Sequence, residues 1–321
     1  MSIIEKAFNK QSDTDAAVKA SPAPAPVLAA AENMVERAVR AAEAAPPAAP
    51  PEKAAPDAPR MEKAADFSAL PRESTTTPMP QSINRARIKK MGLVTPDGER
   101  SQIAEEFRLI KRPLLMNAFG QGAAPIKNGN LIMVTSSVPG EGKSFCAINL
   151  AISIAMEMDR TVLLVDADVA KPRIPEYLGL RTEKGLLDVL RDEHLGLADV
   201  LIKTDIENLT VLPAGRTYRN ATELLASEAM SSLILDIQHR YRDRIVIFDS
   251  PPLLATSEAS VLATHMGQIV MVVEAERTSQ EALREALSHI ESCEVIGMLL
   301  NKTTSLPGAE SYYGYYGSYG T

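Results

Sequence analysis

The chain has 321 residues, enough for one or two ordinary domains with a hydrophobic core. A formal net charge of −7 and a pI of about 5.3 argue against a general nucleic-acid-binding protein, so no nucleic-acid partner is expected. No apolar run reaches the roughly 18–20 residues of a membrane helix, and the charged N-terminus lacks the apolar core of a secretory signal. We therefore expect a cytoplasmic protein. Its two cysteines, Cys146 and Cys293, are expected to be reduced and buried.

The first part of the chain differs in composition from the rest. Residues 1–82 are rich in Ala, Pro and charged side chains and poor in aromatics, which predicts a disordered extension. Within it, Ser2–Lys10 has the spacing of a short amphipathic helix, which would be either a frayed end or a docking peptide.

Residues 83–305 alternate apolar runs with amphipathic stretches, as a folded domain does. Helical spacing begins at Gln102–Leu115. Six apolar runs predict buried strands: Leu131–Thr135, Thr161–Val165, Leu209–Leu212, Ile245–Phe248, Ile269–Val273 and Val295–Leu300. Helices are predicted between them at Lys143–Met158, Leu186–Arg191, Thr222–Arg240, Ser257–Thr264 and Ser279–Glu291. This order predicts an α/β fold with a mostly parallel β-sheet flanked by helices on both faces.

The segment SVPGEGKS, Ser137–Ser144, lies between a predicted strand and a predicted helix. That context is the one a phosphate-binding loop requires, and a coincidental glycine-rich turn is the alternative. Lys143 is expected to reach the β- and γ-phosphates of ATP, and the Ser144 hydroxyl to bind Mg²⁺. Ser137 stands where the first glycine of the motif is usual. The residues expected to contact ATP here are Ser137, Val138, Pro139, Gly140, Glu141, Gly142, Lys143, Ser144 and Phe145.

Three aspartates follow apolar strands. Asp166 and Asp168 end one strand and Asp249 ends another, so all three are expected at the carboxyl edge of the sheet, beside the phosphate loop. A single strand-end aspartate is commonly a cap or turn residue, but three beside such a loop favour metal and catalytic roles. Asp168 and Asp249 are expected to hold Mg²⁺, and Asp166 to orient or deprotonate an attacking hydroxyl.

Residues 306–321 form a tail in which tyrosine alternates with glycine, and it is predicted to be flexible. Five of the eight tyrosines of the chain lie there: Tyr312, Tyr313, Tyr315, Tyr316 and Tyr319. A sticky low-complexity tail is one interpretation. A base-stacking strip is another, but it would need interleaved Lys or Arg, and none follows Lys302. We favour a set of phosphate acceptors, because a mobile tail can bring a phenol to another subunit's γ-phosphate.

Taken in order, the phosphate loop, the second acidic segment, DSPP and the tyrosine cluster resemble those of bacterial tyrosine kinases. The catalytic domain of that family is related to the MinD/ParA class of P-loop ATPases. The resemblance covers about Ile83 to Thr321 and is strongest to the free-standing tyrosine autokinases of exosortase-type exopolysaccharide systems. Ser137 fits that group, as does Val138, where MinD-like proteins carry an extra lysine.

The resemblance assigns roles to individual residues. Asn301 matches a strand-end asparagine that contacts adenine in related ATPases, although on its own it would equally be a turn residue. Many relatives carry Arg at the position of Ala170, for which Lys171 or Arg173 would substitute. The resemblance assigns Lys143 and Ser144 to the Walker A motif and Asp249 to the Walker B motif. Asp166 and Asp168 belong to the second acidic motif, called A′.

The helix with Glu105, Arg108 and Lys111 resembles the E-x-x-R-x-x-R helix that the family uses for ring-like self-association. Here the last position is lysine, with Arg112 beside it, so a bidentate pair is not available at Lys111 itself. Without the family, the same residues would describe an ordinary charged amphipathic helix.

The resemblance implies an ATP- and Mg²⁺-dependent, non-specific protein-tyrosine kinase. It would phosphorylate its own C-terminal tyrosines in trans and regulate exopolysaccharide biosynthesis or export. Its implied partners are further copies of the chain, a membrane-anchored activator of chain length or polymerisation that recruits it to the inner face of the plasma membrane, and a protein-tyrosine phosphatase. Two alternatives remain open: a MinD/ParA-like ATPase that works by nucleotide-switched dimerisation, and a nucleotide-binding scaffold with negligible hydrolysis.

Overall fold

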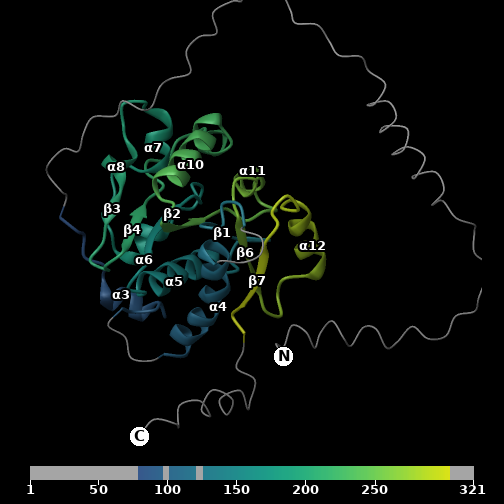
Figure 1. Ribbon diagram of the computed structural model, residues 1–321. Helices are drawn as coiled ribbons and strands as arrows, with labels where there is room; N and C mark the ends of the chain where they lie inside the picture. The colour runs from purple at the N-terminus through teal and green to yellow at the C-terminus, as the bar shows by residue number, and fades with distance from the viewer. Residues whose placement is uncertain (1–78, 97–100, 121–125, 304–321) are drawn as a thin grey trace, which may run out of the picture. The chain divides into compact units, whose positions relative to one another are not determined.

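The computed structural model describes residues 79–96, 101–120 and 126–303 (Figure 1). The predicted disordered extension up to residue 78, the helix at Ser2–Lys10 and the tyrosine tail lie outside the described residues. The fold begins slightly earlier than the predicted start at Ile83. Gln81 forms a parallel bridge with Thr204, and the Ser82 hydroxyl donates a hydrogen bond to Asp205 at 2.9 Å.

A seven-stranded sheet forms the centre of the domain, in the order β3-β4-β2-β5-β1-β6-β7 (Figure 1). Every neighbouring pair is parallel except β3 and β4. The strands are β1 Leu131–Ser136, β2 Thr161–Asp166, β3 Ile202–Lys203, β4 Leu209–Leu212, β5 Arg244–Asp249, β6 Gln268–Glu274 and β7 Ile296–Asn301. The mostly parallel sheet confirms the predicted fold class.

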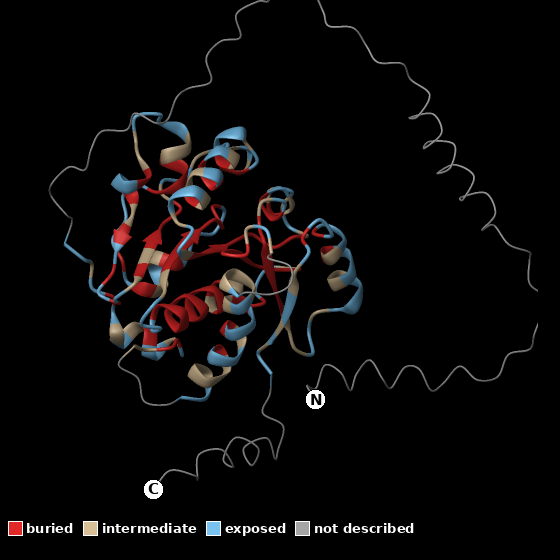
Figure 2. Ribbon diagram, in the orientation of Figure 1, coloured by how far each residue is buried: buried red, intermediate tan, exposed pale blue. Residues whose placement is uncertain are grey.

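Alternate residues of each strand build two separate cores, one on each face of the sheet. In β1, Leu131 and Met133 belong to one core and Ile132 and Val134 to the other, and all four are 0% exposed. Because both faces are covered, the central strands read in the sequence as continuous apolar runs rather than alternating ones. Figure 2 shows these strands as a buried layer inside the domain.

Helices cover both faces. One core receives side chains of α3 Arg85–Lys90, α4 Gln102–Phe119, α5 Lys143–Ala155 and α6 Ile174–Leu178. The other receives side chains of α7 Leu186–Arg191, α8 Leu197–Val200, α9 Ala221–Leu225, α10 Glu228–Arg240, α11 Glu258–Ala263 and α12 Gln280–Ser288. The helices thus flank the sheet on both faces, as predicted.

The structure differs from the predicted elements in several places. The single helix predicted over Thr222–Arg240 is wrong, because Ser227 ends one helix and caps the next by accepting a hydrogen bond from the Met230 N–H at 3.3 Å. An Ala-Ser break carries neither Gly nor Pro, so the apolar spacing runs through it unmarked. The short elements α6, α8 and β3 were not predicted, since two to five residues are too few to show a period.

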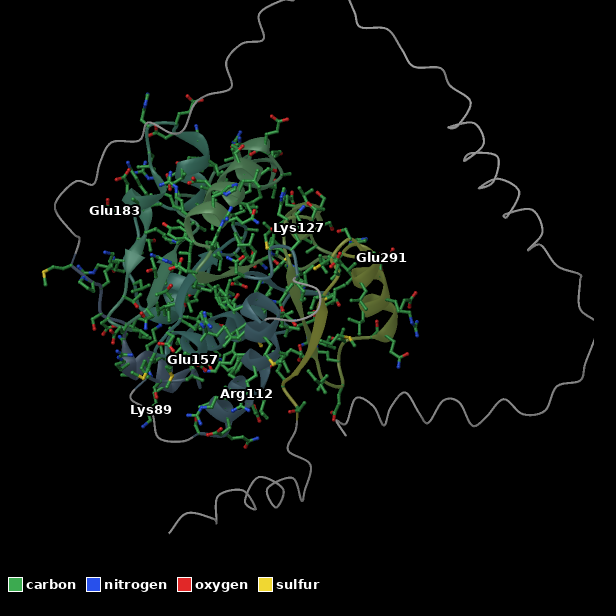
Figure 3. The ribbon with its side chains drawn as sticks, in the orientation of Figure 1. Lys89, Arg112, Lys127, Glu157, Glu183 and Glu291 are labelled. Atoms are coloured by element: carbon green, nitrogen blue, oxygen red, sulfur yellow. The ribbon has the colours of Figure 1, made fainter. Side chains whose placement is uncertain are left out.

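Charged side chains lie mainly at the surface, as Figure 3 shows for the exposed Lys89, Arg112, Glu183 and Glu291. Both cysteines are free and buried, as expected. Within the part of the chain that the structure describes, no helix combines the length and apolar character required to cross a bilayer.

Candidate functional site

The loop after β1 has a backbone that only glycine tolerates at two points. Gly140 has φ 95° and Gly142 has φ 100°, both in the left-handed region. A Cβ atom at Gly142 would also lie 2.1 Å from the Asn301 amide nitrogen. The loop therefore turns tightly over the start of α5 and directs backbone N–H groups toward the space above it.

Lys143, the first residue of α5, reaches across to the loop after β2. Its ammonium lies 2.5 Å from Oδ2 of Asp168, and Asp168 is only 4% exposed. Burial lowers the pKa of Lys143, but the nearby carboxylates of Asp249 and Asp168 outweigh burial and raise it. The lysine is thus fully charged at neutral pH and held at the position where phosphate oxygens would bind.

Asp249, at the end of β5, is a carboxylate without a hydrogen-bonded partner. It is 0% exposed, and neither of its oxygens accepts a well-formed hydrogen bond from a described residue. Burial raises the pKa of Asp249 to about 6, although Lys143 and the Ser144 hydroxyl close by favour its ionised form. Lys143 and Ser144 therefore compensate the buried charge of Asp249 only in part, and a further cation beside this carboxylate would lower the cost of its burial.

This observation fits Mg²⁺. The Ser144 hydroxyl and the carboxylates of Asp168 and Asp249 are hard oxygen donors of the type that Mg²⁺ prefers. Among residues 79–96, 101–120 and 126–303, no cluster of three or more His, Cys, Asp or Glu forms a ready-made metal site. Magnesium bound to one or two carboxylates and completed by substrate phosphates and water needs no such cluster.

Asp166 lies next to Asp249 in the sheet, since the two residues are partners in the β2–β5 register. Its Oδ2 accepts a hydrogen bond from the Ile174 N–H at 3.1 Å, and its Oδ1 has no partner. Burial, followed by repulsion from Asp249, raises the pKa of Asp166 well above its usual range. The side chain is 0% exposed and lies beneath the cleft rather than in its wall.

A cleft of about 800 Å³ opens above these residues. Seven of the predicted ATP-contacting residues line it, together with Asp168: Pro139, Gly140, Gly142, Lys143, Ser144, Phe145 and Asn301. Ser137, Val138 and Glu141 do not. Lys171 and Arg173, named as substitutes for the family's arginine, also line the cleft, and so does Tyr177, which no sequence pattern marked.

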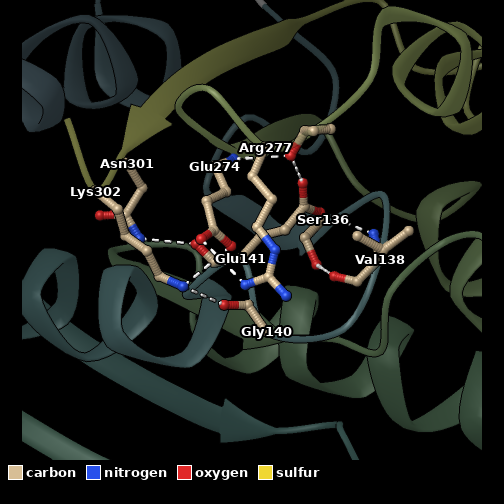
Figure 4. A network of polar contacts seen from close by, with 9 residues as sticks. Ser136, Val138, Gly140, Glu141, Glu274, Arg277, Asn301 and Lys302 are labelled. Atoms are coloured by element: carbon tan, nitrogen blue, oxygen red, sulfur yellow. Dashed lines mark hydrogen bonds and ion pairs between the residues drawn. The ribbon is translucent and has the colours of Figure 1, made fainter.

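The Glu141 side chain turns into the protein instead of toward the cleft (Figure 4). It is 1% exposed, and its Oε2 accepts a hydrogen bond from the Val138 N–H at 2.8 Å. Its Oε1 accepts a second hydrogen bond from the Thr278 hydroxyl. Its backbone carbonyl accepts a third, from the Asn301 amide at 2.8 Å. Glu141 therefore fastens the phosphate loop to the ends of β6 and β7.

A second link joins the loop to the end of β7. The Lys302 ammonium donates a hydrogen bond to the Gly140 carbonyl at 2.8 Å and pairs with Glu274 at 3.0 Å (Figure 4). Arg277 also pairs with Glu274, at 3.3 Å. The contacts of Lys302 and Thr278 with the phosphate loop could not be predicted from the sequence, because no local pattern connects these residues to a loop well over a hundred residues earlier.

The expected self-association residues fall into two groups. Arg108 and Glu105 are partly exposed and form an ion pair with each other at 2.5 Å. Lys111 is instead held inside the domain, where its ammonium donates to the Ser153 carbonyl at 2.6 Å and pairs with Glu157 at 2.7 Å. The expectation that Lys111 contacts another copy is therefore corrected, because packing of α4 on α5 turns that helix face inward.

The fold and this site together define a nucleotide-binding protein of the P-loop class. In agreement, the sequence model of the AAA domain family matches residues 129–302, more than half of the chain. The chain is also similar to the tyrosine-protein kinase YwqD of Bacillus subtilis strain 168, with 30% identity over 237 residues, which are 73% of this chain and 95% of YwqD. The chain belongs to the family of bacterial tyrosine-protein kinases.

The chain is also similar to two further proteins. The crystal structure of the chimerical protein CapA2B2 matches with a TM-score of 0.58 and 28% identity, over 71% of this chain and 95% of that one. ExoP of Rhizobium meliloti strain 1021, a succinoglycan biosynthesis transport protein, is 32% identical over 246 residues, which are 72% of this chain and 30% of ExoP. The chain thus spans less than a third of ExoP.

Proposed function

We propose that the protein is an ATP-dependent tyrosine autokinase that phosphorylates the C-terminal tyrosines of neighbouring copies. The observation that carries this proposal is the placement of Lys143, Ser144 and Asp168 in the wall of one cleft, with the buried carboxylate of Asp249 close to Lys143 and Ser144. Membership of the tyrosine-protein kinase family and the five tyrosines of the tail support tyrosine as the acceptor. The alternative of a nucleotide-switched ATPase shares the cleft but gives the tail no role.

In the proposed reaction, a tyrosine oxygen forms a bond to the γ-phosphorus of ATP while the bond to the β–γ bridging oxygen breaks and ADP leaves. Lys143 and the backbone N–H groups of the loop neutralise charge on the transferring group. Ser144, Asp168 and Asp249 would hold Mg²⁺, which would supply further charge neutralisation. A tyrosine with a pKa near 10 is neutral before attack, so its proton passes to an A′ carboxylate. Asp168 lines the cleft, whereas Asp166 lies beneath it.

Transfer between copies requires self-association. We propose that Glu105 and Arg108, both partly exposed on α4, contribute to a ring-like assembly, and that Asn301 contacts the adenine. Further proposed partners are a membrane-anchored activator of chain length or polymerisation and a protein-tyrosine phosphatase. With them, the protein would act at the inner face of the plasma membrane and regulate exopolysaccharide biosynthesis or export. The similarity to ExoP, a succinoglycan biosynthesis transport protein, supports this last step.

Incubation with γ-labelled ATP and Mg²⁺, followed by mapping of the label by mass spectrometry, tests the proposal. We expect label on Tyr312–Tyr319, and no label after Lys143→Met. Lys127→Met, at an exposed position away from the cleft, is the matched control and should label normally. Release of free phosphate without labelled tyrosine would instead establish the ATPase alternative, and neither label nor release would establish a scaffold.

A further inference from the structure

An apolar groove of about 860 Å³ runs between α4 and β7, next to the nucleotide cleft. Its α4 wall includes Ile103, Phe107 and Ile110, and its other wall is formed by β7. The two hollows share a partition, because Phe145, Asn301 and Lys302 line both.

The β7 wall of the groove is an open sheet edge. Among the described strands, β7 pairs only with β6, so its other side presents backbone N–H and C=O groups without a strand partner. Met298 and Leu300 are 63% and 61% exposed, whereas the residue between them, Leu299, packs against the core. All three residues line the groove, so the exposed edge and the groove form one apolar surface. Natural proteins seldom leave such an edge uncovered.

The chain itself supplies a segment at this edge. Thr303, the last described residue, lines the groove, and residues 304–321 follow it. Eighteen extended residues reach about 60 Å, while the stretch from Val295 to Thr303, which contains β7, is about 26 Å long if extended. The sequence Pro307-Gly308 in this segment is a turn signal that would direct the following residues back along β7.

The composition of that segment matches the edge. If extended, it places Tyr313, Tyr315 and Tyr319 on one face, because side chains alternate along a strand. Its only charged side chain is that of Glu310. Tyrosine favours strands and pairs well with apolar neighbours across a sheet.

We propose that the unphosphorylated tail docks on its own domain, with Ala309–Tyr319 as an added antiparallel strand beside β7 and tyrosine rings in the α4–β7 groove. Attachment at Thr303 keeps the tail at a high effective concentration near this site, which favours it over the tail of another copy. A docked tail is held away from the nucleotide cleft by the Phe145, Asn301 and Lys302 partition.

Phosphorylation would reverse this docking. Each phosphate adds about −1.5 to −2 charges, which an apolar groove disfavours, and the two charged side chains that line this groove, Glu106 and Lys302, carry opposite charges. Only this consequence rests on the proposed kinase function; the docking does not, and it is tested without nucleotide.

Hydrogen exchange measured by mass spectrometry on the full-length, phosphatase-treated chain tests the docking. We expect amides of Ile296–Asn301 and of Tyr312–Tyr319 to exchange at least about tenfold more slowly than in the variant M298K/L300K. The matched control M158K/L235K changes one methionine and one leucine that are also exposed, at 95% and 51%, and should keep the protection. Unchanged exchange of β1 peptides in both variants verifies the fold.

Three results would overturn the proposal. Tail amides of the parent chain could exchange at the rate of an unstructured peptide. Protection could survive in M298K/L300K, which would place the tail elsewhere. Protection could also rise with protein concentration, which would assign the groove to the tail of a second copy.

Discussion

Two buried aspartates of the domain, Asp188 and Asp249, have contrasting surroundings. Asp188, at the start of α7, is 5% exposed and accepts hydrogen bonds from the Tyr218 hydroxyl at 2.6 Å and from the Gly185 and Arg216 N–H groups at 2.8 and 3.1 Å. Asp249 is 0% exposed and has no such partner.

Because their hydrogen bonding differs, the pKa of Asp188 is lowered and the pKa of Asp249 is raised. Burial opposes ionisation of both groups, but at Asp188 the hydrogen bonds outweigh burial and lower the pKa. At Asp249 burial dominates and raises the pKa to about 6. A satisfied carboxylate stabilises the fold, whereas an unsatisfied one is maintained at a cost and indicates a ligand. The contrast therefore distinguishes Asp188, whose hydrogen bonds stabilise the fold, from Asp249, for which we propose a role in binding Mg²⁺.

Asp249→Asn should give the largest effect. If Asp249 holds Mg²⁺, tyrosine labelling falls by about a hundredfold or more, because charge neutralisation at the phosphates is lost. The stability of the ligand-free protein should stay the same or rise by about 1–2 kcal/mol, since a buried charge that is compensated only in part is removed. Labelling assays and urea unfolding without nucleotide or Mg²⁺ measure the two effects. A clear loss of ligand-free stability would contradict the claim that Asp249 lacks a partner.

Asp188→Asn should do the opposite. It leaves buried N–H and O–H donors poorly matched and should cost about 2–3 kcal/mol of unfolding free energy at pH 7, with labelling retained at low temperature. Because the folded pKa of Asp188 is lowered, its contribution is present above the unfolded pKa of about 4 and is lost as pH falls through the folded value. The cost of the substitution should therefore shrink in acid. Urea unfolding from pH 7 downward measures this, with the exposed Asp243→Asn as the control.

A smaller effect on nucleotide binding is expected at Thr278, whose hydroxyl holds the Glu141 side chain of the phosphate loop. Thr278→Val removes the hydroxyl that donates to Glu141, so Glu141 holds the loop by one hydrogen bond fewer. Nucleotide affinity should fall by about three- to tenfold, the equivalent of about 1 kcal/mol, with little change in stability. Titration calorimetry measures the affinity. The control is Thr264→Val, which removes a hydroxyl that donates to the Val261 backbone carbonyl at 2.7 Å. Thr264 is exposed, and this substitution should leave the affinity unchanged.

The parts of the site that the sequence predicted are those with local signals. A strand, a glycine-bearing loop and a helix mark Lys143 and Ser144, and acids that end apolar runs mark Asp168 and Asp249. The inward turn of Glu141 and the burial of Lys111 could not be predicted, because each depends on an element elsewhere in the chain: Thr278 for the first, and α5 for the second.

The same limit applied to the fold. Central strands were predicted because burial on both faces leaves an uninterrupted apolar run. The break at Ser227 was missed, because a serine cap inside an apolar helical pattern has no conformational marker such as Gly or Pro. The apolar pattern of the sequence therefore identifies the buried strands well, but it locates the breaks between helices poorly.

Lys302→Met should give the smallest effect. It removes the hydrogen bond to the Gly140 carbonyl and the ion pair with Glu274, but Lys302 is partly exposed, so solvent screens both. Nucleotide affinity should fall by less than about fivefold. The loss should be smaller than in Thr278→Val, because the Thr278 hydroxyl bonds to Glu141, which is buried. Lys184→Met, at an exposed position outside the cleft, is the control. An effect of Lys302→Met larger than that of Thr278→Val would mean that the outer link, and not the buried Glu141, sets the shape of the phosphate loop.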